Sequence, residues 1–425
     1  MEKESKRSFY ITTFLIGLGF FTMGMMDPLY DSFVPIFLQK YISSKGIIGS
    51  IMTIDNIFAI FLIPIVSAIS DRTRTPIGRR MPYILVTLPM SALFFALIPF
   101  GYLKSLVALI IVLFLLNIFK QSARGPVVAL MPDTVPADFR SEANGVINTM
   151  GGIATIIGSL FLAKLMDLSI NLPIIGNSKD KLPFIIAGFL VVLATIILFL
   201  TVKEKQRGES EKKVSIGKSL KLIFSAEDKS AILILFSLLF WFLGYQGVLP
   251  FVTMYAMQFI GVTKGTAGIS PGMVGLAYAI FAVPSGIVAH KIGRKKTISI
   301  SLIGIFIIIL LIFFSKPFAD YVNLSQTIHL FIFWGLLFLF GIFWVSVITN
   351  SFPMLWQMAT YDDMGIYTGL YYTFSQTAAI LAPPIAGFLM DWLGFRVVFI
   401  YTAICMMVAF TLMQFVKKGE PQKLE

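Results

Sequence analysis

Five ionisable side chains lie inside long apolar stretches of this sequence. Asp27 and Asp31 are one helical turn apart in the first stretch, Asp55 lies in the second, and Lys120 and Arg124 are one turn apart in the fourth. A charge within a membrane is costly, and such residues usually serve a function. Carboxylates can bind a proton or a sodium ion. We therefore predict a cation-coupling site, with Lys120 as its internal counter-charge.

Two other interpretations of these residues stay open. Asp27 or Asp55 could form a static buried ion pair with Lys120 that only joins helices. The acids, Asp31 first among them, could instead be exposed at the outer membrane surface. Arg124 lies nearer the inner end of its stretch, and could be a gate residue that pairs with Asp71 or Asp133.

The elements that hold these residues are membrane-spanning helices. Of the 425 residues, 57% are hydrophobic and 13% are charged, about half the charged share of a soluble domain. A span needs about 20 apolar residues. The first run lacks a signal-peptide cleavage site, so we expect it to be retained. The runs predict helices at 9–38, 46–70, 82–102, 104–131, 144–167, 182–202, 230–260, 267–289, 297–315, 327–357, 366–390 and 395–416.

The distribution of basic residues predicts the orientation. Most of the 34 Lys and Arg residues fall in the tails and loops that lie inside if the N-terminus is inside. We therefore expect both termini in the cytoplasm. The longest polar stretch divides the helices six and six, which predicts an N-terminal bundle (1–202), a cytoplasmic linker (203–229) and a C-terminal bundle (230–425).

The two halves resemble each other in sequence. Segments 145–167 and 369–391 both begin with Gly, both end in Leu-Met-Asp, and both carry small residues between. Parallel six-helix repeats around a midplane site are the design of one large transporter architecture. The sequence thus predicts an all-α membrane protein of twelve transmembrane helices.

Two loops carry a family resemblance. SDRTRTPIGRRMPYI (70–84) follows the second helix and GIVAHKIGRKK (286–296) follows the eighth. Both resemble the signature of the major facilitator superfamily, which implies that fold and a cytoplasmic gate. Gly permits the tight turn, and the arginines can pair with an acid and with helix carbonyls. The implied gate residues are Asp71, Arg72, Gly78, Arg79, Arg80, Asp133, Arg140, Gly293, Arg294 and Lys295, with His290 replacing the acid in the second copy.

A closer resemblance is to the glycoside–pentoside–hexuronide:cation symporters and the sucrose-carrier-like group. It rests on the longer first loop, on 117–145 and on 368–384. The cation sites of these carriers do not transfer. Asn117 stands where plant sucrose carriers have an acid, and Ala59 and Ile63 stand where melibiose-type carriers have aspartates.

Aromatic and amide side chains suggest where a sugar would bind. Aromatic rings stack on sugar faces and amides bond to hydroxyls, but such residues also form interfacial belts or fill gaps between helices. All five tryptophans lie in the second half. We predict that the second half holds most of the sugar, through Trp241, Tyr245, Gln246, Trp344, Tyr371, Tyr372 and Gln376, with Asn117 from the first half.

The sequence also excludes several classes of protein. It has one cysteine, two histidines and no nucleotide-binding motif, so we expect no disulfide framework, metal centre, cofactor or primary pump. We predict a monomeric H⁺- or Na⁺-coupled sugar symporter of a bacterial inner membrane, not an enzyme and not a nucleic-acid binder. The alternatives are a proton-coupled drug antiporter of the same fold and a non-transporting membrane sensor.

Overall fold

The computed structural model describes residues 2–135, 140–204, 228–359 and 364–420. Over this part of the chain, twelve helical segments are long and apolar enough to cross a membrane. Helices are the expected solution, because the backbone N–H and C=O groups within a bilayer must bond inside the same segment. The first six segments are Tyr10–Gln39, Lys45–Arg72, Met81–Lys104, Leu106–Thr134, Ala143–Asp167 and Leu182–Thr201. The other six are Ser230–Ile260, Lys264–Ile292, Arg294–Tyr321, Gln326–Trp356, Tyr367–Leu393 and Val397–Gln414.

The helices of the first half of the sequence follow the predicted ranges to within a few residues. They are α1 (Glu2–Gln39), α2 (Lys45–Met52), α3 (Ile54–Arg72), α4 (Met81–Lys104), α5 (Leu106–Thr134), α6 (Arg140–Ile156) with η2 (Ile157–Leu162) and η3 (Ala163–Asp167), and α7 (Leu182–Thr201). A short hairpin that the sequence did not predict, β1 (Asn171–Leu172) with β2 (Gly176–Asn177), joins η3 to α7.

The second half repeats this order. Its elements are α9 (Ser230–Val248), η4 (Leu249–Phe251), α10 (Val252–Tyr255), η5 (Ala256–Ile260), α11 (Lys264–Gly268), α12 (Ser270–Ile292), α13 (Arg294–Tyr321), α14 (Gln326–Trp356), α15 (Met364–Leu393) and α16 (Val397–Gln414). The predicted seventh helix is interrupted at η4 because Pro250 cannot continue the α-helical hydrogen bonding. Most of the predicted linker, 205–227, lies outside the described residues.

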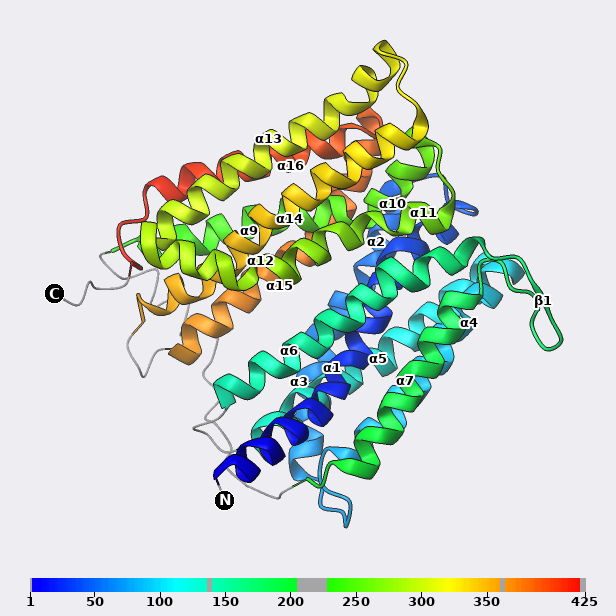
Figure 1. The fold of residues 1–425 in the computed structure, drawn as a ribbon, viewed down its shortest axis with the longest axis vertical. Coiled ribbons are helices and arrows are strands. Elements are labelled where there is room, and N and C mark those ends of the chain that lie inside the picture. Colours follow the sequence, from blue (N-terminus) through cyan, green and yellow to red (C-terminus); the bar gives the residue numbers. More distant parts are fainter. Residues whose placement is uncertain (1, 136–139, 205–227, 360–363, 421–425) are drawn as a thin grey trace. The chain divides into compact units, whose positions relative to one another are not determined.

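The described residues form two compact units that differ from the sequence halves at two segments. Unit 1 contains residues from 1–41, 54–209 and 263–272, and unit 2 contains residues from 42–53, 210–262 and 273–425. The start of the predicted second helix thus groups with unit 2, and the start of the eighth groups with unit 1. In unit 1, α1 packs on α6 and α7, and α5 packs on α3 and α4 (Figure 1).

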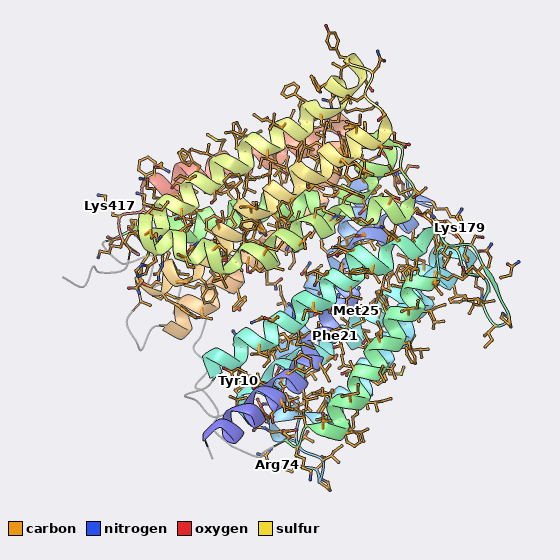
Figure 2. The ribbon with its side chains drawn as sticks, in the orientation of Figure 1. Tyr10, Phe21, Met25, Arg74, Lys179 and Lys417 are labelled. Carbon is orange, nitrogen blue, oxygen red and sulfur yellow. The ribbon has the colours of Figure 1, made fainter. Side chains whose placement is uncertain are left out.

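Unit 1 is held by an aromatic core. Phe184 on α7 contacts Phe33 and Phe37 of α1 and Phe95 of α4, with ring centroids 5.1–6.2 Å apart. All four side chains are fully buried. Figure 2 shows that Arg74, in the loop after α3, and Lys179, just beyond the hairpin, lie at opposite ends of this unit. The core therefore fixes α1, which carries Asp27 and Asp31, against α4 and α7.

One helix crossing in unit 1 depends on a glycine. A Cβ atom on Gly24 of α1 would lie 2.3 Å from the carbonyl oxygen of Gly151 on α6. A Cβ atom on Gly151 would meet nothing closer than 3.6 Å. The two glycines at the same crossing thus differ in their tolerance of a side chain, because only the first meets backbone that cannot move aside.

We expect Gly24→Ala to destabilise the protein by about 1–3 kcal/mol, the usual cost of overpacking, whereas Gly151→Ala should be nearly neutral. Thermal unfolding of the two variants in detergent, followed by intrinsic fluorescence, measures the difference. Equal melting temperatures for both variants would contradict this account of the crossing.

Candidate functional site

Lys120 and Asp27 form an ion pair between α5 and α1. The Lys120 Nζ atom lies 2.5 Å from Asp27 Oδ1, and the lysine side chain is 9% exposed whereas the aspartate is 47% exposed. Of the two pairs that the sequence left open, the structure therefore forms Asp27–Lys120. A nearly buried ammonium and a half-exposed carboxylate make a pair that an incoming cation can reach from the acid side.

A buried tyrosine and an amide fix the position of this pair. The Asn117 Nδ2 atom donates a hydrogen bond to the Tyr30 hydroxyl at 3.1 Å, and both residues are buried. The Lys120 ammonium lies 5.1 Å from the centre of the Tyr30 ring, within the range of a cation–π interaction. Tyr30, missed by the sequence prediction, thus holds both side chains on α5. Its place one turn after Asp27 was the available signal.

The other two acids lie close enough to interact electrostatically with Lys120 but form no ion pair with it. The Asp31 carboxylate interacts electrostatically with Asp27 and Lys120. The Asp55 carboxylate interacts electrostatically with Lys120, Asp27 and Arg124. Asp55 lies at the start of α3 and accepts a hydrogen bond from the Asn56 backbone N–H at 2.6 Å. The carboxylates of Asp27, Asp31 and Asp55 therefore all interact electrostatically with the one ammonium of Lys120.

Arg124 does not form either of the two ion pairs that were considered for it. Its side chain is exposed on α5 and forms no ion pair among the described residues. Asp71 and Asp133, its proposed partners, bind other arginines. Arg124 therefore presents a cationic group within a predicted membrane span, one turn from Lys120.

The loop after α3 forms an arginine–carboxylate network in unit 1. Arg79 Nε and Arg80 Nε donate to the same oxygen, Oδ2 of Asp133, at 3.0 and 2.9 Å, and a second nitrogen of Arg79 binds Oδ1. Arg80 also binds Asp71. The hydrogen bonds that Arg79 donates to Asp133 raise the pKa of Arg79. The predicted gate residues Arg79, Arg80, Asp71 and Asp133 are thus in contact with one another.

Gly78 makes this loop conformation available. Its φ of +113° lies in the region that favours glycine. Arg72, another predicted gate residue, is exposed and has no ion pair among the described residues. The side chain of Arg140 lies outside the described part of the chain.

Glu204 is a functional candidate that the sequence prediction missed. Its Oε2 atom accepts hydrogen bonds from the backbone N–H groups of Arg80, at 2.9 Å, and Met81, at 3.3 Å. It therefore caps the start of α4, where the helix dipole favours an anion. The signal in the sequence was an acid immediately after the sixth helix, on the predicted inner side.

The second copy of the loop, in unit 2, is built differently. Gly293 has a φ of +97°, and Glu420 accepts hydrogen bonds from the N–H groups of Arg294 and Lys295 at 2.8 and 2.7 Å. The Arg294 guanidinium donates to the Pro353 carbonyl at 3.1 Å. His290, at the position of the acid, is exposed. Both loops therefore have an acid that caps the next helix, but the Arg294 guanidinium binds a backbone carbonyl where Arg79 and Arg80 bind carboxylates.

Two of the predicted sugar-binding aromatics stack on each other in unit 2. Trp344 of α14 stacks on Tyr245 of α9, with ring centroids 4.1 Å apart, and is itself buried. Tyr371 is also buried, and its hydroxyl lies 3.1 Å from that of Ser351. Trp241 has no exposed surface at all. Trp344 and Tyr245 therefore pack on each other, and Trp241 and Tyr371 are buried elsewhere in the unit.

The remaining predicted sugar contacts differ in exposure. Tyr372 on α15 is 56% exposed. Gln246 and Gln376 are half-buried, and the Gln376 Oε1 atom has no hydrogen-bond partner among the residues that the structure describes. Tyr372 is thus the exposed member of this set, and the Gln376 Oε1 and Trp241 Nε1 atoms have no hydrogen-bond partner among the described residues.

These observations define a class of protein, and sequence comparison agrees with it. A model of the Major Facilitator Superfamily matches residues 10–383 and, in a second overlapping match, residues 234–425. The chain belongs to this superfamily. It is therefore an integral multi-pass membrane protein and a secondary transporter of a small molecule, not an enzyme. The predictions of the fold class and of the superfamily are confirmed.

Individual relatives are distant. The chain is 23% identical over 424 residues to an uncharacterised MFS-type transporter of Methanocaldococcus jannaschii, covering 97% of this chain and 96% of the relative. The fold of this chain is similar to that of a bacterial homologue of the human lysosomal transporter Spinster. The TM-score is 0.70 at 14% identity, and the match covers 97% of this chain and 96% of the other. The nucleoside transporter NupG gives a TM-score of 0.72 at 12% identity, covering 95% and 100%.

We expect Asp133→Asn to destabilise the protein much more than Asp71→Asn. Removing the charge of Asp133 leaves two buried guanidinium groups without their shared partner, which costs about 3–5 kcal/mol. Asp71 is half-exposed, and exposed pairs contribute about 0–1 kcal/mol. Unfolding by SDS titration measures both changes. A larger loss for Asp71→Asn would show that Asp133 is not the centre of the network.

Proposed function

We propose that this protein is a symporter that moves a sugar or glycoside together with H⁺ or Na⁺ by alternating access. The Asp27–Lys120 ion pair is the observation that carries the proposal, because a transporter that needed no cation would gain little from a charged pair in the membrane. The resemblance to the glycoside–pentoside–hexuronide:cation symporters supports the same substrate class. We place the protein, as a monomer, in a bacterial inner membrane.

The chemistry of coupling follows from the arrangement of charges. Lys120 is nearly buried, so its ammonium requires a nearby anion. When a cation binds the half-exposed Asp27, that carboxylate is neutralised and its attraction for Lys120 weakens. Asp31 and Asp55 then supply the remaining negative field around the ammonium. Cation binding would in this way change the position of Lys120 and of α5 relative to α1.

Polar side chains in each unit are the groups that we assign to sugar binding. A neutral polyol needs donors and acceptors but no net charge. In unit 1, Asn117 offers an amide whose Oδ1 atom is unpaired among the described residues. In unit 2, taken by itself, Tyr372, Gln246 and Gln376 offer such groups.

The competing substrate class is a lipophilic cation carried by a drug antiporter. Such a cation would meet the cationic side chains of Lys120 and Arg124, which disfavour it. Because the fold is shared by transporters of different solutes, among them the nucleoside transporter named above, the fold does not choose between substrates. A direct measurement of transport distinguishes the two substrate classes.

We expect proteoliposomes containing the protein to accumulate at least one labelled sugar from a panel of sucrose, maltose, melibiose, lactose and glucose when a proton or sodium gradient is imposed. Asp27→Asn and Asp55→Asn should each abolish gradient-driven accumulation, while exchange of sugar at equal concentrations survives. Asp320→Asn is the matched control, because Asp320 is an exposed acid paired with Lys316 on the same helix. No sugar uptake under any gradient would move the assignment to the drug antiporter.

A second prediction separates coupling from folding. Asp27→Asn alone leaves the Lys120 ammonium without its direct counter-charge, and we expect a loss of about 3–5 kcal/mol of stability. The double variant Asp27→Asn/Lys120→Met should recover most of that loss, because both charges are then removed, yet should remain uncoupled. Thermal unfolding and gradient-driven uptake are measured on the same samples. A double variant that regained coupling would overturn the proposed role of Asp27.

A further inference from the structure

A carboxylate near the end of α15 holds the start of α2. Asp391 accepts hydrogen bonds from the backbone N–H groups of Lys45 and Gly46, at 2.8 and 3.0 Å, and from the Ser44 hydroxyl at 2.5 Å. Ser44 is itself the N-cap residue of α2. The first N–H groups of a helix have no partner within it. One carboxylate therefore satisfies two of these groups and faces the positive end of the helix dipole.

The backbones of these two helices are in direct contact. A Cβ atom on Gly387 of α15 would lie 2.3 Å from the Lys45 carbonyl oxygen, and one on Gly49 of α2 would lie 2.2 Å from the Pro383 carbonyl oxygen. The glycines allow the approach that brings the N–H groups of α2 within reach of Asp391. The contact is thus specific in shape as well as in charge.

The first half of the sequence contains a matching carboxylate. Asp167, at the end of η3, accepts hydrogen bonds from the Thr263 hydroxyl at 2.6 Å and from the Gly265 N–H at 3.1 Å. Thr263 is the N-cap residue of α11. Both acids end a Leu-Met-Asp segment, and both receive a Ser/Thr-Lys-Gly segment. The arrangement is therefore part of the internal repeat and occurs once in each copy.

These two contacts, which we call the Asp391 clasp and the Asp167 clasp, explain how the units are divided. Residues 42–53 group with unit 2 and residues 263–272 with unit 1, although each belongs by sequence to the other half. Each clasp attaches the start of a helix from one half to helices of the other half. Both acids lie at helix ends that the distribution of basic residues predicts to be outer.

The two clasps are not equally strong. In the Asp167 clasp, Lys264 Nζ forms an additional ion pair with Asp180 at 2.9 Å and lies 5.5–5.7 Å from the rings of Phe37 and Tyr102. In the Asp391 clasp, the equivalent Lys45 ammonium lies 4.0 Å from Asp391 and has no other ionic partner among the described residues. The Asp167 clasp thus has a second anchor that the Asp391 clasp lacks.

We propose that Asp391 and Asp167 are positioning residues of the transport cycle. Their clasps hold the starts of α2 and α11 against the ends of α15 and η3. The hydrogen bonds of both clasps break when the protein opens to the outer side. The Asp391 clasp releases more readily, because it has one anchor. This inference rests on the assignment of the chain as a secondary transporter and is independent of which solute or cation it carries.

A distance measurement tests the proposal directly. Spin labels on Ile47→Cys and Trp392→Cys report the separation of α2 from α15, and both positions are exposed, so labelling should not disturb packing. Cys405, the one native cysteine, is buried, and unsubstituted protein measures its background. In liposomes we expect Asp391→Asn to increase the ratio of long to short distances about fivefold, the factor that corresponds to about 1 kcal/mol for a lost helix cap.

Controls distinguish a clasp from a general loss of stability. Asp320→Asn, which removes an exposed acid paired within one helix, should leave the distances unchanged. If Asp391→Asn lowers the melting temperature but leaves the distances of the folded protein unchanged, the residue is merely structural and the proposal fails. Uptake assays play no part in this test, so a failed sugar assignment cannot be mistaken for a failed clasp.

The unequal anchoring gives a second test with the same label pair. Asp167→Asn should shift the distances less than Asp391→Asn, because Lys264 remains bound to Asp180. The double variant Asp167→Asn/Asp180→Asn should shift them further than Asp167→Asn alone. Equal shifts for Asp167→Asn and for this double variant would show that Asp180 is not a second anchor.

Discussion

A charge that is buried in a membrane protein is costly unless an opposite charge lies nearby, and the arrangement of this protein depends on that constraint. Lys120, nearly buried on α5, is neutralised by Asp27 of α1. Arg79 and Arg80, buried at the inner end of unit 1, converge on Asp133. In each case helices that are distant in sequence are brought together, because burying either charge without the other would destabilise the fold. The same pairs that join the helices are the ones that a bound cation or a change of conformation could alter.

A second use of carboxylates recurs at the helix ends. Glu204 and Glu420 cap the helices that follow the two arginine-rich loops, and Asp391 and Asp167 cap the starts of α2 and α11. Each acid comes from a different helix or segment than the one it caps. A cap of this kind stabilises the helix start and also joins two elements. Because it consists of a few hydrogen bonds at one point, it can break without unfolding either helix.

The aromatic residues of the two units show how packing limits what composition can predict. In unit 1 they form a closed core around Phe184, as the abundance of phenylalanine suggests. In unit 2, Trp344 is a predicted sugar contact whose ring stacks on Tyr245, another predicted contact. A tryptophan within a span looks the same in sequence whether it lines a site or fills a core. Only the neighbours supplied by other helices distinguish the two.

The sequence by itself determined the twelve helices, because the length of an apolar run is a local property and the thickness of the bilayer sets the length that a span needs. It also located Asp27, Asp31, Asp55 and Lys120, because charges stand out in apolar runs. It could not decide that Asp27, rather than Asp55, binds Lys120, since that choice depends on how α1, α3 and α5 are rotated and packed. Nor could it find the clasps, because the acid and the helix start lie 98 residues apart in one clasp and 346 in the other, and their hydrogen bonds exist only once the helices are packed together.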